Sequence, residues 1–171
     1  MFQNNFVVTN TFRFIVFVVL QVLILNHINF LGYINPYIYI IFILLFPFAG
    51  NKSLLLFLSF LLGLTIDMFC DSGGIHAAAS VTIAFLRPLA LRFSFGVSYE
   101  HNNIKLYKTP LNERLRYITL LVLIHHFILF SLEIFSIQNI ILILKSTLFS
   151  SIFSILLITC ILMLFGRSDS K

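Results

Sequence analysis

Charged side chains are scarce in this 171-residue sequence, yet three groups that could do chemistry lie close together. In the stretch GLTIDMFCDSGGIHAAAS, at 63–80, Asp67 and Asp71 are four residues apart, and His76 follows a Ser-Gly-Gly turn. Residues four apart on a helix share one face. Two carboxylates and an imidazole placed in this way could bind a metal ion, carry protons, contact a substrate, or hold two helices together by hydrogen bonds.

Metal binding is the weakest of these interpretations. Carboxylate and imidazole are suitable ligand types, but the cluster has no second metal-binding motif beside it. His125 and His126, in ITLLVLIHHFILF, are adjacent, so on a helix they point about 100° apart and do not chelate as i,i+4 histidines do. We expect one of them to face the bundle, hydrogen-bonded to another helix, and the other to face the interface. We predict no metal site and no cofactor.

The composition predicts an integral membrane protein of the all-α class. Apolar residues make up 60% of the chain and charged residues 10%, against about 25% in typical soluble domains. The mean hydropathy is +1.04. The apolar runs are continuous, as in FIVFVVLQVLIL, whereas a membrane β-barrel would alternate apolar and polar residues. The spanning elements are therefore predicted to be helices.

Six apolar segments predict one membrane domain, 1–171, built as a six-transmembrane-helix bundle. A helix needs about 20 apolar residues to cross the hydrocarbon. Segment 37–48 is short for this and is bounded by Pro36 and Pro47, so a re-entrant hairpin or a start near Phe30 are alternatives. The first segment lacks a small-residue cleavage site and is expected to remain as a helix. The predicted helices are 12–31, 37–48, 53–69, 75–95, 115–135 and 137–165, with a polar loop at 96–113.

The basic residues predict the orientation. With six crossings and both termini in the cytoplasm, ten of the eleven Lys and Arg residues fall at or near the cytoplasmic side, and Lys145 is the exception. This agreement is the reason for keeping segment 37–48 as a crossing. The formal net charge of +5 is explained in the same way, so no nucleic-acid partner is predicted. We expect a multi-pass protein of the cell inner membrane, in contact with the lipid bilayer.

The helix positions place the acidic cluster at the outer side of the membrane. Lys52 marks the cytoplasmic end of its helix, and Asp67 follows fifteen residues later, about 22 Å along the axis. A carboxylate at this depth needs a partner. We favour a lock between helices over a transport ligand, with His76, His125, His126 or Lys145 as the partner. Asp71 is either part of this cluster or a solvated interfacial charge.

Other residues of this region have simpler interpretations. Gly63, Gly74 and the alanines at 77–79 are expected to let helices pack closely. Arg87, before Pro88, either snorkels to the cytoplasmic interface or forms a docking element beside the basic loop. Gln21, Asn26 and His27 are expected to form interhelical hydrogen bonds. Cys70 and Cys160 predict no disulfide. The sequence contains no nucleophile elbow, phosphate loop or zinc-protease motif, and we predict that the protein is not an enzyme.

The stretch GLTIDMFCDSGGIHAAASVTIAFLRP closely resembles the rod shape-determining protein MreD family, in the form found in Bacteroidetes. Its specific part is G-x-x-x-D-x-x-x-D-x-x-G-x-H, and LQVLILNHINFLGYINPYIYIIFILLFP is similar to the first hairpin of the family. The resemblance implies a membrane component of the elongasome, which inserts peptidoglycan along the sides of the cell. It implies MreC as a direct partner, with MreB, the glycosyltransferase RodA and a class B penicillin-binding protein in the same complex.

The resemblance also implies an alternative function. The family is similar in fold to the substrate-binding subunits of energy-coupling-factor transporters, so a small-molecule binding subunit is the second possibility. A transporter subunit would need a polar pocket large enough for its ligand at the outer side, together with an ATPase module. On the elongasome interpretation, Asp67, Asp71, Gly74, His76 and Arg87 would form a helix lock or a partner surface.

Overall fold

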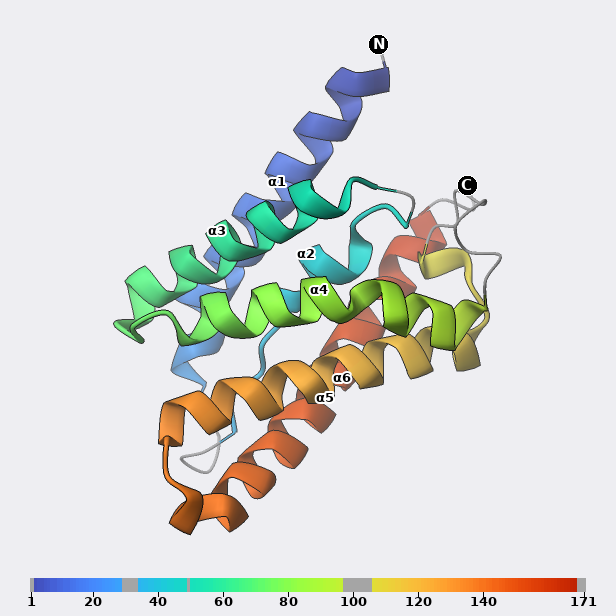
Figure 1. Cartoon of the computed structure of the whole chain (residues 1–171). Helices are drawn as coiled ribbons and strands as arrows, with labels where there is room; N and C mark the ends of the chain where they lie inside the picture. Colours follow the sequence, from blue (N-terminus) through green and yellow to red (C-terminus); the bar gives the residue numbers. More distant parts are fainter. Residues whose placement is uncertain (1, 29–33, 49, 97–105, 169–171) are drawn as a thin grey trace.

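A computed structural model of the protein describes residues 2–28, 34–48, 50–96 and 106–168 (Figure 1). Residues 29–31 of the first predicted helix lie outside the described residues, as do 97–105 of the predicted loop and the basic residues Lys105 and Lys171. The elements are α1 (Phe2–Leu23), η1 (Leu25–His27), α2 (Ile40–Leu45), α3 (Lys52–Cys70), α4 (Ile75–Phe95), η3 (Leu106–Lys108), α5 (Leu111–Ile134), η4 (Ile137–Asn139) and α6 (Ile140–Ser168), where η marks a short 3₁₀ turn.

A side-chain cap and residues in the left-handed conformation set the ends of α3 and α4. The Asn51 side chain accepts hydrogen bonds from the N–H groups of Ser53 and Leu54, which caps the start of α3. Asp71 ends α3 in the left-handed conformation, with φ of 53°, and Gly74 precedes α4 with φ of 98°. Two such residues reverse the chain within a few positions. The predicted ranges 53–69 and 75–95 therefore agree with α3 and α4 to within one residue.

The last four helices form consecutive antiparallel pairs. α3 packs on α4, α4 on α5 and α5 on α6, while α1 lies beside α3 (Figure 1). The starts of α3 and α5 and the end of α4 therefore share one end of the bundle, which carries Lys52, Arg92 and Arg114. We call this the basic end. The opposite end carries the α3–α4 turn with Asp71, and we call it the acidic end.

Five helical segments of the described residues are long and apolar enough to cross a membrane, so the membrane-helix class is supported. The prediction of a sixth spanning helix at 37–48 is wrong. The helix there, α2, has six residues and is about 9 Å long. Residues 34–38 before it are not helical. Because non-helical residues extend by up to about 3.3 Å each, the segment still covers much of the bilayer thickness.

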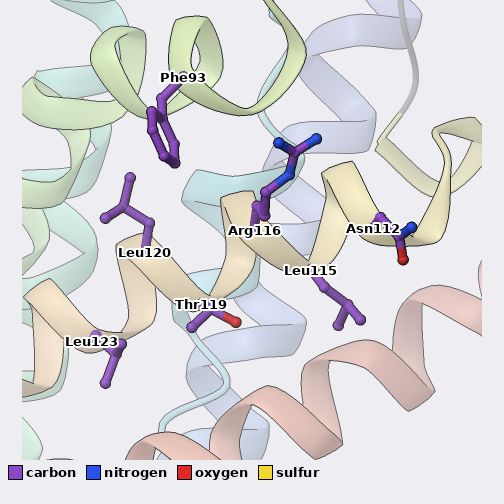
Figure 2. A pocket seen from close by; sticks show the side chains of 7 residues that line it. All are labelled: Phe93, Asn112, Leu115, Arg116, Thr119, Leu120 and Leu123. Carbon is purple, nitrogen blue, oxygen red and sulfur yellow. The ribbon is translucent and has the colours of Figure 1, made fainter.

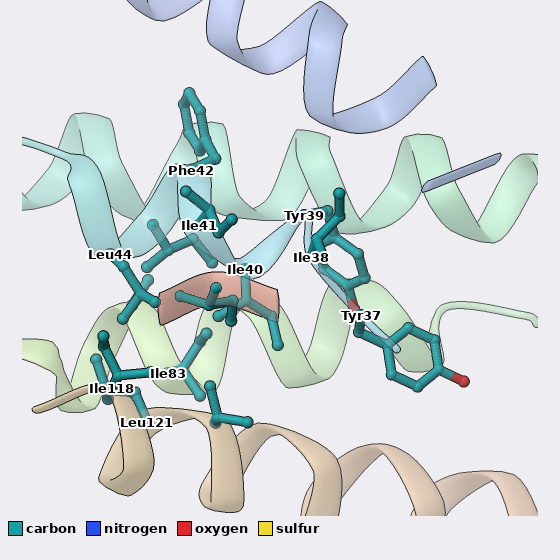
Figure 3. Close-up of a cluster of buried hydrophobic side chains, with 14 of the residues drawn as sticks. Tyr37, Ile38, Tyr39, Ile40, Ile41, Phe42, Leu44, Ile83, Ile118 and Leu121 are labelled. Carbon is teal, nitrogen blue, oxygen red and sulfur yellow. The ribbon is translucent and has the colours of Figure 1, made fainter. Parts of the chain in front are cut away.

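This irregular segment, 34–48, runs through the centre of the molecule from the acidic end to the basic end. It follows η1, whose Asn26 contacts Cys70 at the end of α3, and it leads to Asn51, which caps the start of α3. Residues 37 to 44 are all 5% exposed or less. Figure 3 shows their side chains packed with Ile83 of α4 and with Ile118 and Leu121 of α5. Non-helical backbone is tolerated at membrane depth where protein surrounds it, and here the five long helices provide that cover.

Candidate functional site

Asp67 joins the end of α3 to the start of α4. Its Oδ1 accepts hydrogen bonds from the backbone N–H of His76 (2.9 Å) and from the hydroxyl of Ser72 (2.5 Å), and its Oδ2 accepts one from the N–H of Ala77 (2.9 Å). The first N–H groups of a helix lack intrahelical partners, and the helix dipole favours a negative charge beside them. Asp67, only 4% exposed, therefore caps α4 from the neighbouring helix.

These partners differ from those expected from the sequence. Within the described residues, Asp67 bonds to two backbone N–H groups and a serine hydroxyl instead of to the side chains of His76, His125, His126 or Lys145. Asp67 and His76 are brought together, but the contact uses the main chain of His76. A lock between α3 and α4 requires contacts of this kind, because they tie the last turn of one helix to the first turn of the next.

The other residues of the turn have separate positions. The Asp71 side chain is exposed, and its backbone N–H donates to the carbonyl of Asp67 as part of the left-handed end of α3. Gly73 and Gly74 both have positive φ, at 65° and 98°. An L-residue with a side chain is strained in that region. Asp71 and Gly74 thus shape the turn through their backbones, and the Asp71 carboxylate faces solvent.

Gly63 allows α3 and α4 to approach closely, as the sequence predicts. A Cβ atom built on Gly63 would lie 2.4 Å from the Cα and 2.5 Å from the N of Ala77 on α4. Real Cβ atoms do not approach backbone atoms so closely, so any side chain at 63 would force the helices apart. Since Ala77 also donates its N–H to Asp67, this close contact and the cap act on the same turn of α4.

A group of tyrosine and histidine rings surrounds the start of the irregular segment. The His76 imidazole stacks on the Tyr39 ring, with centroids 5.9 Å apart, and lies edge-on to Tyr37 at 5.6 Å. The Tyr39 hydroxyl and His125 Nε2 share a 2.7 Å hydrogen bond. The rings of His125 and His126 are 5.4 Å apart. These five residues form one buried aromatic cluster, to which the irregular segment contributes the two tyrosines and helices α4 and α5 contribute the three histidines.

The expectation that one of the two adjacent histidines faces the interface is wrong, because both are fully buried. His126 Nδ1 lies 2.8 Å from the carbonyl of Val122, so it must carry the proton and donate, since a carbonyl only accepts. His126 Nε2 then accepts from the Ser154 hydroxyl at 3.1 Å, and the Ser154 oxygen accepts from the N–H of Tyr37 at 3.0 Å. This relay connects α5, α6 and the irregular segment.

Gln21 of α1 holds the irregular segment from the other side. Its Oε1 accepts from the N–H of Ile38 at 2.9 Å, and its Nε2 donates to the carbonyl of Pro36 at 3.1 Å. The hydroxyl of Ser150 on α6 accepts from the N–H of Asn35 at 3.2 Å. Side chains from α1 and α6 therefore supply partners that a helix would have supplied from its own backbone.

Arg87 completes the same pattern at the basic end of the segment. Its Nε donates to the hydroxyl of Tyr117 at 2.8 Å, one terminal nitrogen donates to the carbonyl of Phe46, and the other lies 3.4 Å from the carbonyl of Pro47. The guanidinium also lies 5.5 Å from the centre of the Phe48 ring. These carbonyls follow the last turn of α2, where backbone acceptors need partners.

The position of Arg87 corrects both sequence interpretations. It is 3% exposed, so it neither snorkels to the interface nor presents its charge beside the loop. It points inward because the irregular segment offers carbonyl oxygens inside the bundle. No local signal in the sequence pairs residue 87 with residues 46 to 48.

At the acidic end, a cavity of about 200 Å³ lies beside the cap and the aromatic cluster. Asn26 and Cys70 on its wall are themselves joined by a 3.0 Å contact from Asn26 Nδ2 to the Cys70 sulfur. The buried Nδ1 of His76 has no hydrogen-bond partner among the described residues. The lining residues are Asn26, Asn35, Tyr37, Cys70, Ser72, Ile75, His76, Leu129 and Glu133.

The polar residues of this bundle mainly serve its own backbone. Asp67 satisfies the start of α4, while Gln21, Ser150, Ser154 and Arg87 satisfy the irregular segment. In the part of the chain that the structure describes, no group of three or more His, Cys, Asp or Glu side chains is placed to hold a metal ion. No family model, curated protein or solved structure matches this chain.

Proposed function

We propose that this chain is a non-enzymatic membrane component of the bacterial elongasome, of the MreD kind. In this role it binds MreC and works with MreB, RodA and a class B penicillin-binding protein in the synthesis of side-wall peptidoglycan. One observation carries the proposal. The stretch that resembles the family is the stretch whose residues build the closely packed α3–α4 hairpin, through the Asp67 cap, the Gly63 contact and the turn at Asp71 and Gly74.

The hydrogen bonds of Asp67 and Arg87 support a structural role for these two residues over a role in catalysis or ligand binding. The Asp67 carboxylate is occupied by three hydrogen bonds, and Arg87 is occupied by backbone carbonyls and Tyr117. Because α3 and α4 contact each other through these groups, the outer faces of the hairpin are the parts available to a partner within the membrane. Met68 and Phe69, at the end of α3, are 78% and 65% exposed. We place the MreC contact at this corner.

The proposed orientation follows the distribution of charge. The basic end carries Lys52, Arg92 and Arg114 at the ends of three helices. Lys and Arg are enriched on the cytoplasmic side of membrane proteins, so we assign the basic end to the cytoplasm of the inner membrane. Both termini then lie in the cytoplasm, and the α3–α4 turn faces the side on which peptidoglycan is made.

The test is co-purification with the MreC protein of the same organism. The wild-type chain is expected to retain MreC, and Met68→Ser is expected to reduce its recovery. The matched control is Ile141→Ser on α6, which changes a residue of similar exposure (73%) without touching the hairpin. If wild-type protein retains no MreC, the elongasome role is rejected. Turnover of a cell-wall precursor by the isolated chain would reject the non-enzymatic role.

The alternative, a substrate-binding transporter subunit, is favoured only by the polar cavity at the acidic end. At about 200 Å³ this cavity is smaller than the roughly 300 Å³ of the smallest sites for drug-sized ligands. Recovery of an ATPase module instead of MreC would support the transporter subunit. Genes for cell shape or for transport beside the coding gene would separate the two functions independently.

A further inference from the structure

A second surface, at the basic end of the bundle and away from the α3–α4 turn, is a shallow, mostly apolar groove. It has a volume of about 530 Å³ and lies over the outward face of α5, with one wall from α4. Figure 2 shows Phe93 of α4 directed toward α5, with Leu120 opposite it and the Arg116 side chain rising toward α4. The residues that line it include Phe93, Asn112, Arg116, Leu120 and Leu123.

The groove changes in polarity along its length. Asn112 and Arg116 lie within the first two turns of α5, which begins at Leu111 at the basic end. Leu120 and Leu123 lie deeper, and Leu123 is twelve residues, or about 18 Å, from the helix start. One leaflet accounts for about half of the 30 Å hydrocarbon core. The groove therefore spans about one leaflet, with its polar groups at the surface and its apolar groups toward the membrane centre.

The charge at the polar end favours an anion. Among the described residues, this end carries Lys52, Arg92, Lys108, Arg114 and Arg116 against one carboxylate, Glu113. Arg116 and Asn112 are both exposed, whereas Arg114 is buried and donates to the carbonyl of Tyr107. A guanidinium presents several N–H donors in a geometry suited to phosphate. A headgroup that carries its own cation would add positive charge to an end that is already basic.

We propose that this groove binds an anionic phospholipid, with the phosphate at Arg116 and Asn112 and an acyl chain along Phe93, Leu120 and Leu123. The lipid belongs to the leaflet at the basic end, which is the cytoplasmic leaflet in the orientation proposed above. The site lies at the opposite end of α4 from the α3–α4 turn and from the corner at Met68 and Phe69, so it can be tested independently of the proposed MreC contact.

Native mass spectrometry of the purified full chain tests this site, with phosphatidylglycerol and phosphatidylcholine of matched acyl chains titrated separately. Wild-type protein is expected to bind phosphatidylglycerol about fivefold more tightly, which corresponds to the roughly 1 kcal/mol that one basic residue contributes near an anionic membrane. Arg116→Gln should remove this preference. Lys52→Gln is the matched control, because Lys52 is exposed at the same end but does not line the groove, and it should retain the preference.

A second variant tests the groove without changing any charge. Leu123→Trp should lower the binding of both phospholipids, because Leu123 is 37% exposed at the deep end and a larger side chain there fills the groove. The site is rejected if Arg116→Gln and Lys52→Gln have equal effects, or if Leu123→Trp leaves binding unchanged. Displacement of phosphatidylglycerol by an equimolar long-chain isoprenoid phosphate would reject the phospholipid as the occupant.

Discussion

Replacing Asp67 by alanine should destabilise the bundle without disturbing its other contacts. The substitution removes both carboxylate oxygens and with them three hydrogen bonds, from the N–H groups of His76 and Ala77 and from the Ser72 hydroxyl. The apolar packing of α3 is retained, because Asp67 contributes little apolar surface. The loss of stability in this variant therefore measures the contribution of the Asp67 cap that joins α3 to α4.

The expected loss in free energy of unfolding follows from the number of hydrogen bonds removed. Hydrogen bonds between membrane helices average about 0.6 kcal/mol each, so three bonds predict a loss of about 2 kcal/mol. This agrees with the upper part of the range for replacing a helix N-cap by alanine, about 0.5 to 2 kcal/mol. Asp67→Asn keeps one acceptor oxygen but places an NH₂ group opposite the N–H of Ala77 or His76, so about half of this loss is expected.

The assay is reversible unfolding of the purified chain in mixed micelles, with the free energy of unfolding compared between variants. Asp71→Asn is the matched control, because Asp71 has the same side chain four positions later but faces solvent. Its left-handed backbone is one that asparagine also adopts, so its effect should stay below about 0.5 kcal/mol. Equal stability of Asp67→Ala and Asp71→Asn would refute the assignment of Asp67 as the cap of α4.

Three further predictions concern packing, the irregular segment and topology. Gly63→Ala should lower the free energy of unfolding by about 1 to 3 kcal/mol in the same assay, because its methyl group would overlap the α4 backbone; an unchanged stability would contradict the close approach. Gln21→Leu conserves volume but removes two hydrogen bonds to the irregular segment, so it should lower the free energy of unfolding by about 2 kcal/mol and speed amide hydrogen exchange at Ile38. Unaltered exchange at Ile38 would contradict the role of Gln21 in holding this segment. In a cysteine-free background, an impermeant maleimide added outside intact spheroplasts should label Gln138→Cys and not Lys108→Cys, and the reverse pattern would invert the proposed orientation.

The helices that the sequence predicts best are those bounded by turn residues. α3 and α4 are predicted within one residue because Gly73 and Gly74 separate two apolar runs. The starts of α1 and α5 are predicted too late, at 12 and 115 instead of at 2 and 111. Hydropathy marks only the part of a helix that lies in hydrocarbon, whereas helical hydrogen bonds continue into the polar residues before it.

The irregular segment shows what one-dimensional patterns miss. Its prolines and its short length indicate that 37–48 is unusual, but the distribution of Lys and Arg favours a sixth crossing and so leads to the prediction of a spanning helix. The partners of its backbone lie far away in the chain, at Gln21, Arg87, Ser150 and Ser154. Polar residues isolated in several apolar helices, together with one segment too short to span, are the combined signal that could have suggested this arrangement.

The same segment constrains the order in which the protein can be assembled during synthesis. Residues 34–48 leave the ribosome after Gln21 but before Arg87, Ser150 and Ser154 exist. Each unsatisfied backbone group in hydrocarbon costs several kcal/mol, so the nascent segment is not stable in lipid at that stage. It must remain at the membrane surface or within the insertion machinery until α4 and α6 arrive. The insertion of α6 thus completes the assembly of the bundle. In a ribosome-arrested chain that ends before Ser150, residues 34–48 should therefore be accessible to protease.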